Sequence, residues 1–162
     1  MVVDPALIGV VGALAGAIVG LVGSIAVQRT ANVHARELWA RQQRTNMLTN
    51  QRADLLKAIY EFVLAAERAQ GMAGPDRSGG EQSEASAVMW ATCRLVRAMA
   101  TEQLRNAASE YANELHQAIW SPNGAPAWER AHPANVAFSE AVDAELALLD
   151  AEIASVSSLQ PD

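Results

Sequence analysis

The stretch ALIGVVGALAGAIVGLVGSIAV, residues 6–27, carries no charged side chain and a single polar one, Ser24. As an α-helix its 22 residues would be about 33 Å long, close to the hydrocarbon core of a bilayer at about 30 Å. Asp4 and Pro5 precede it, and both residue types are favoured where a helix begins. The pattern predicts a transmembrane helix, which makes residues 1–27 a membrane anchor.

Two other interpretations of this stretch are weaker. A cleaved signal peptide has basic residues ahead of a shorter apolar core, whereas no Lys or Arg precedes residue 6. Residues 24–26, Ser-Ile-Ala, are the one feature that resembles a cleavage site. A buried core helix of a water-soluble protein would need apolar surface on all sides, and the rest of the chain offers too little.

Glycines recur along the stretch at helical spacing. Gly12, Gly16 and Gly20 form two overlapping GxxxG motifs, which in lipid allow two helix backbones to approach closely. This face is the predicted helix-packing interface, either with a second copy or with another membrane protein. The alternative is that glycine and alanine are simply frequent in membrane helices. The predicted interface consists of Gly9, Gly12, Gly16, Gly20 and Gly23, which share one helix face.

Positive charge follows the stretch and none precedes it. Residues 28–57 hold six bases and two acids. Because positive flanks stay on the cytoplasmic side, we expect a single-pass inner-membrane protein with its N-terminus outside and its C-terminal part in the cytoplasm. The bases nearest the membrane should lie near lipid headgroups as ordinary flanking charge rather than as a lipid-specific site. They are Arg29, Arg36, Arg41 and Arg44.

Helical periodicity continues after the anchor, in a sequence rich in alanine and poor in β-branched residues. Residues 28–46 are expected to form a basic helical stalk. The first bundle helix should run from Met47 to near Gly71, the second from about Ser83 to Trp120, and the third from about Pro133 to Val156. The prediction is an all-α chain in which the transmembrane helix continues into a cytoplasmic antiparallel three-helix bundle, residues 47–158, with a tail at 159–162.

Details of the predicted second helix bear on this bundle. Its apolar side slips in phase between Met99 and Leu104. If it paired back along the first helix over its full length, Trp39, Trp120 and Trp128 would gather at the membrane-proximal end. The single Cys93 cannot form an intrachain disulfide, which fits a reducing compartment, and its apolar neighbours indicate an ordinary buried thiol.

The sequence holds no recognisable catalytic, cofactor or metal motif. It lacks a phosphate-binding glycine loop, a nucleophile elbow and a cysteine pair for zinc. Glu110, Glu114 and His116 share one helix, but without the spacing of a di-iron site. Residues 28–57 sum to +4 and residues 58–162 to −9, from six bases and fifteen acids, which argues against nucleic acid. We therefore expect no enzyme, no cofactor and no nucleic-acid partner.

The N-terminal part carries four recognisable features: the opening VDPALI at residues 3–8, the glycine-rich stretch, the exit QRTA at residues 28–31, and YEFVLAA at residues 60–66. In these it resembles a group of small actinobacterial membrane proteins, over roughly the first 70 residues. That group is functionally uncharacterised, so the resemblance implies a single-pass anchor and no functional residue.

The function expected from these patterns is that of a membrane-anchored helical interaction or scaffold protein. Its partners would be membrane lipid, a second copy or another membrane protein through the transmembrane helix, and an unknown cytoplasmic protein. The alternative is a holin-like or small pore-forming protein that assembles through the glycine face.

Overall fold

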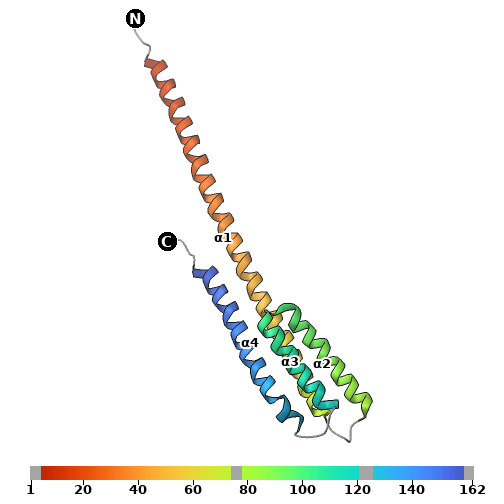
Figure 1. The fold of residues 1–162 in the computed structure, drawn as a ribbon. Coiled ribbons are helices and arrows are strands. Elements are labelled where there is room, and N and C mark those ends of the chain that lie inside the picture. The colour runs from red at the N-terminus through yellow and green to blue at the C-terminus, as the bar shows by residue number, and fades with distance from the viewer. Residues whose placement is uncertain (1–4, 74–77, 121–125, 159–162) are drawn as a thin grey trace. The chain divides into compact units, whose positions relative to one another are not determined.

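The computed structural model describes residues 5–73, 78–120 and 126–158, and within these ranges it describes side chains at residue 28 and from residue 31 onward. Four α-helices follow one another: α1 (Pro5–Gly71), α2 (Gly79–Met99), α3 (Glu102–Trp120) and α4 (Ala127–Ser158) (Figure 1). The described residues include no strand. The all-α prediction is confirmed, and α1 ends at the predicted glycine.

Two compact units divide the chain, Met1–Arg44 and Thr45–Asp162. The first unit contains the N-terminal part of α1, whose described side chains are almost all exposed. The second contains residues 45–71 of α1 together with α2, α3 and α4. Among the residues whose side chains are described, all the buried ones belong to this second unit.

Where side chains are described, none of the four helices holds a segment that is both long and apolar enough for a membrane crossing. The predicted span, residues 6–27, lies on the helical backbone of α1, but its side chains are outside the described residues. The same holds for the glycine face and for Arg29. The glycine face consists of Gly9, Gly12, Gly16, Gly20 and Gly23.

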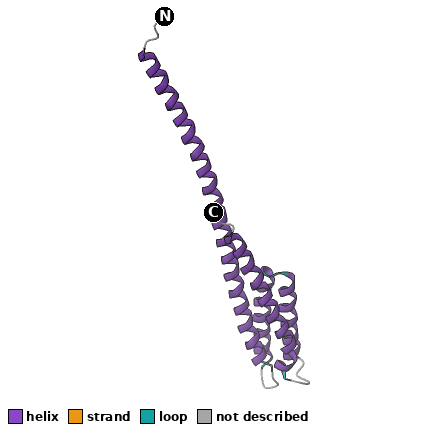
Figure 2. Cartoon of the chain, turned by 90° about the vertical axis from the view of Figure 1, so that its left-hand side faces the viewer, coloured by secondary structure: helices purple, strands orange, loops and turns teal. Residues whose placement is uncertain are grey.

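Successive helices of the bundle run antiparallel, and α3 packs against both α2 and α4 (Figures 1 and 2). Phe62 of α1 lies at the centre and is fully buried. Its ring meets Tyr111 of α3 and Phe138 of α4 edge-on, with centroids 5.9 and 5.2 Å apart. Each such aromatic pair adds about 0.5–1.5 kcal/mol to the apolar burial of the rings. This cluster therefore ties α1, α3 and α4 together.

Over its described residues the bundle has four helices, so the predicted three-helix arrangement is wrong. The predicted second helix is broken between Met99 and Glu102, where Ala100 adopts an extended backbone with φ −90° and ψ 157°. Thr101 follows, and both its backbone N–H and its hydroxyl donate to the carboxylate of Glu145 on α4. The phase slip between Met99 and Leu104 marks this break, since a single straight helix cannot bury both apolar runs on one face.

Two helix starts also differ from the predicted ones. α2 begins at Gly79, because Ser78 and Glu81 form a capping box: the Ser78 Oγ accepts from the Glu81 N–H at 3.3 Å, and the Ser78 N–H donates to Glu81 Oε2 at 3.3 Å. α4 begins at Ala127 rather than at Pro133, which lies inside the helix. Pro133 removes one backbone hydrogen bond near the start of α4, and the helix continues through it.

The expected gathering of tryptophans at the membrane-proximal end is wrong for the bundle. Because α3 reverses direction after the break, its C-terminal residue Trp120 comes to the end of the bundle where α1 finishes (Figure 1). Trp128 lines a hollow of about 440 Å³ together with Gly71 at that same end. Trp39 belongs to the other unit.

Candidate interaction face of helices α2 and α3

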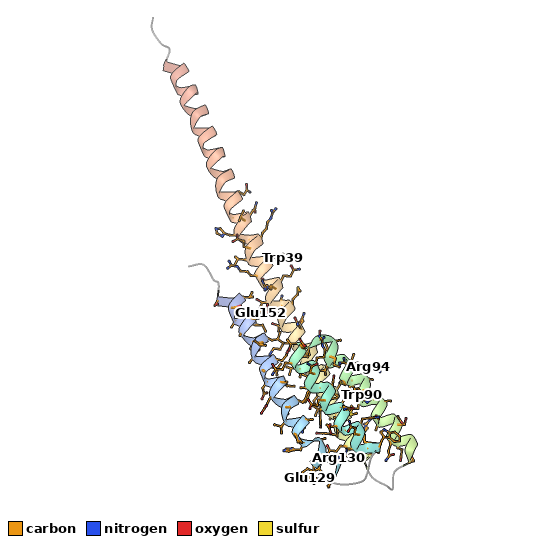
Figure 3. All side chains as sticks on the ribbon, viewed as in Figure 1. Trp39, Trp90, Arg94, Glu129, Arg130 and Glu152 are labelled. Carbon is orange, nitrogen blue, oxygen red and sulfur yellow. The ribbon has the colours of Figure 1, made fainter. Side chains whose placement is uncertain are left out.

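Basic and aromatic side chains gather along the outer seam between α2 and α3. On α2 they recur at residues 90, 94 and 97, a spacing of four and three that keeps them on one helix side. Figure 3 shows Trp90 and Arg94 close together on this helix. We call this seam the α2–α3 face; it consists of Trp90, Arg94, Arg97, Arg105, His116 and Trp120.

Three arginines border a shallow, open hollow of about 410 Å³ on this face. Arg94, Arg97 and Arg105 line it together with Ala98, and all four are exposed. Arg105 donates to the Ala100 carbonyl at 3.2 Å, which fixes its guanidinium near the α2–α3 turn. Among the described residues, no carboxylate lines the hollow or pairs with Arg94 or Arg97. Residues 58–162 contain six bases and fifteen acids, and three of these six bases lie at the hollow.

Cys93 lies behind these arginines and is fully buried. Its thiol contacts the Ala108 carbonyl at 3.5 Å. Burial raises the pKa of the Cys93 thiol above its ordinary value, against the lowering effect of the Arg97 and Arg94 charges. A protonated, enclosed thiol is a poor nucleophile. Its burial confirms the prediction of an ordinary core cysteine.

A partly buried hydrogen bond joins α2 and α3 in the other half of the seam. Ser86 Oγ on α2 lies 2.8 Å from His116 Nδ1 on α3, and Ser86 is only 5% exposed. Because the hydroxyl is enclosed between the helices, this pair stabilises the seam and has no room to attack an external bond. The His116 ring lies between Trp90 and Trp120, with centroids 6.4 and 6.3 Å away. The hydrogen bond therefore holds the imidazole ring that both indoles contact.

The membrane-flanking arginines predicted from the sequence are not part of this face. Arg36 and Arg44 are exposed and Arg41 is half-buried, all on α1 in the first unit. Glu110, Glu114 and His116 make no metal site, and the described part of the chain contains no group of three or more His, Cys, Asp or Glu side chains suited to a metal. Glu145 of α4, which was not predicted as a functional residue, is 6% exposed and bonded to Thr101.

The α2–α3 face was not predicted. In one continuous helix Arg105 would lie eight residues, or about 12 Å, beyond Arg97, and the three arginines would not surround a common hollow. The reversal at Ala100 folds α3 back along α2 and brings Arg105 beside the other two. The phase slip, combined with the spacing of Trp90, Arg94 and Arg97 beside the apolar side, was the signal available in the sequence.

Comparison with protein-family models, with characterised proteins and with solved structures found no match. The function therefore has to be inferred from the chemistry of this chain alone.

Proposed function

We propose that this chain is a single-pass membrane-anchored helical interaction protein. Residues 6–27 would anchor it in the inner membrane with the bundle in the cytoplasm, and the α2–α3 face would bind an acidic protein segment. The observation that carries the proposal is the arginine-lined hollow with two tryptophans on the same face.

Arginine and tryptophan are the side chains that most often dominate protein interfaces. A guanidinium forms paired hydrogen bonds with a carboxylate, which gives orientation as well as attraction. Trp90, half-buried and one turn before Arg94, offers apolar area beside these charges, and Trp120, 46% exposed, lies farther along the same face near the other end of α3. An acidic partner with one apolar side chain fits this combination.

Nucleic acid fits the face less well. Phosphate-backbone binding needs positive charge spread over a broad surface. Here three arginines stand on a domain whose sequence, over residues 58–162, sums to −9. Such a domain attracts a small acidic patch at the hollow and repels an extended polyanion elsewhere.

The proposed anchor is supported by the sequence. Residues 6–27 contain no charged side chain, and all flanking positive charge comes after them. The absence of charge within the stretch also favours dry helix packing through the glycines over a water-filled pore.

A photo-crosslinking amino acid at Ala98 of the full chain, in native membranes, tests this function. Ala98 lines the hollow and is exposed. We expect a protein adduct that Arg94→Glu/Arg97→Glu removes. The same probe at Ala53, an exposed position on α1, is the matched control. Absence of an adduct at Ala98, or an adduct that survives the double reversal, would overturn the proposed interaction face.

A further inference from the structure

We propose that the partner of the α2–α3 face is helix α4 of a second copy of this chain. Copies would join side by side, with the arginine hollow of each against the acidic side of the next α4. The inference rests on the proposed function, since it names the partner of the same face.

α4 is the most acidic element of the bundle. Beyond Arg130 it contains five acids and no Lys or Arg. Glu145 is buried, but Glu140 and Asp143 are exposed, and neither pairs with a base among the described residues. They are three residues apart and therefore neighbours on the helix surface. α4 therefore presents two carboxylates without an ion-pair partner among the described residues, and α2 presents two such guanidiniums, those of Arg94 and Arg97.

The orientation of α4 places these carboxylates away from the arginine hollow of their own chain. Arg52 of α1 donates to both carboxylate oxygens of Asp150, at 2.7 and 3.3 Å, so that side of α4 faces α1. Asp143 lies seven residues before Asp150, close to two full turns, so it lies toward the α1 edge of α4 rather than the α3 edge, and it remains exposed there. α3 separates α4 from α2 (Figure 1). Both surfaces of one copy are therefore available at the same time.

The arginine hollow and the α4 carboxylates also lie at similar positions along the axis of the bundle. The Thr101 N–H donates to Glu145 Oε1 at 3.1 Å, which sets the α2–α3 turn level with Glu145. Asp143 is two residues from Glu145, about 3 Å along α4, and Arg97 and Arg105 are four residues from Thr101, about 6 Å. When the bundles of two copies lie parallel, the hollow of one therefore meets the carboxylates of the next without a shift along the bundle axis.

A contact between two different surfaces is heterologous, and it produces rings or rows rather than a closed pair. Each exposed ion pair contributes little by itself. Anchoring in a membrane raises the effective concentration of one copy around another, so weak contacts suffice for assembly. The assembly should weaken as salt is added.

Disulfide crosslinking of the full chain in liposomes tests the inference. Ala98 in the hollow and Ala147, one turn from Asp143, are both exposed. We expect a chain with Ala98→Cys and Ala147→Cys to give a ladder of dimers, trimers and larger products. Ala98→Cys with Ala53→Cys, a position on α1, is the control for random collision and should give no ladder. Equal ladders in the two chains would overturn the inference.

Charge reversal adds a second, independent measurement on the same double-cysteine chain. Arg94→Glu/Arg97→Glu alone, or Glu140→Arg/Asp143→Arg alone, should reduce the ladder at least tenfold. Mixing the two reversed chains should restore it, because each then offers the charge that the other needs. Lys57→Glu/Arg68→Glu changes the same amount of charge at exposed positions of α1 and should leave the ladder intact.

Failure of this inference differs from failure of the proposed function. A ladder that the reversals do not change, or that mixing does not restore, shows that α4 of a second copy does not fill the hollow. If the probe at Ala98 then still forms an adduct with another protein, the proposed interaction function stands and only its partner is wrong. Circular dichroism of each variant confirms that the bundle is folded.

Discussion

Thr101 and Glu145, 44 residues apart in sequence, are joined by two hydrogen bonds to one buried carboxylate. The Thr101 N–H donates to Oε1 at 3.1 Å, and the Thr101 hydroxyl donates to Oε2. The N–H belongs to the residue that precedes α3, where backbone donors have no partner within the helix. Glu145 thus caps α3 from another helix and holds the reversal that forms the α2–α3 face.

Glu145→Ala should lower the free energy of unfolding by about 2 kcal/mol, because it removes a buried acceptor and leaves the Thr101 N–H unpaired. Glu145→Gln keeps one oxygen for that N–H and should cost about half as much. Urea denaturation of the full chain in detergent measures both. Glu140→Ala, at an exposed position of the same helix, should change stability by less than about 0.5 kcal/mol. Equal losses at residues 140 and 145 would contradict the capping role.

The sequence predicted the elements better than their connections. Apolar spacing identified the helical segments and Gly71 as the end of α1, since both depend on residues close in sequence. The break at Ala100 depends on Glu145, a residue on another helix that reads as one more surface acid. Local spacing carries no information about that contact.

The starts of α2 and α4 were also predicted at the wrong residues, for two different reasons. The start of α2 is encoded locally, because Ser78 and Glu81 have the spacing of a capping box, although the adjacent glycines at 79 and 80 are by themselves typical of a loop. The start of α4 could not be predicted in this way, since Pro133 normally marks a helix start and here lies inside a helix. The α2–α3 face depended on the missed break, so no reasoning from single helices could place Arg105 beside Arg97.

Alkaline pH should destabilise the bundle through Cys93. Burial raises the pKa of its thiol above the ordinary value of 9.0, so the folded chain keeps a proton that the unfolded chain releases. Stability is then unaffected below about pH 9 and falls as the pH rises toward the folded pKa. Burial and the Glu67 charge raise the Tyr111 pKa above 10.0 and extend the loss to higher pH.

The measurement is the free energy of unfolding between pH 8 and 10, in steps of about half a unit. The parent chain should lose stability from about pH 9 upward, whereas Cys93→Ala should show a flat profile until Tyr111 begins to contribute. Identical slopes in the two chains would mean that the thiol has the same pKa in the folded and unfolded states.

Orientation in the membrane has its own test. All flanking positive charge follows residues 6–27, so Val2→Cys should react with an impermeant thiol reagent added to intact cells. Ser157→Cys should react only after the cells are permeabilised. The parent chain, whose only thiol is the buried Cys93, serves as the blank. The reverse labelling pattern would place the bundle on the outer side and rule out a cytoplasmic partner.

Self-association through residues 6–27 should depend on the glycine face and not on the other faces of that helix. Gly16 is the central residue of the two overlapping GxxxG motifs, so a branched side chain there would hold two backbones apart and remove the packing that drives association in lipid. Gly16→Ile should therefore reduce self-association at least fivefold in a membrane two-hybrid assay. Ala15→Ile adds a branched chain at the neighbouring position, about 100° around the helix, and should retain most of the parent signal. Because each variant introduces an isoleucine into the same apolar stretch, the two chains should insert into the membrane equally well. Equal two-hybrid signals from Gly16→Ile and Ala15→Ile would exclude the glycines as the contact surface.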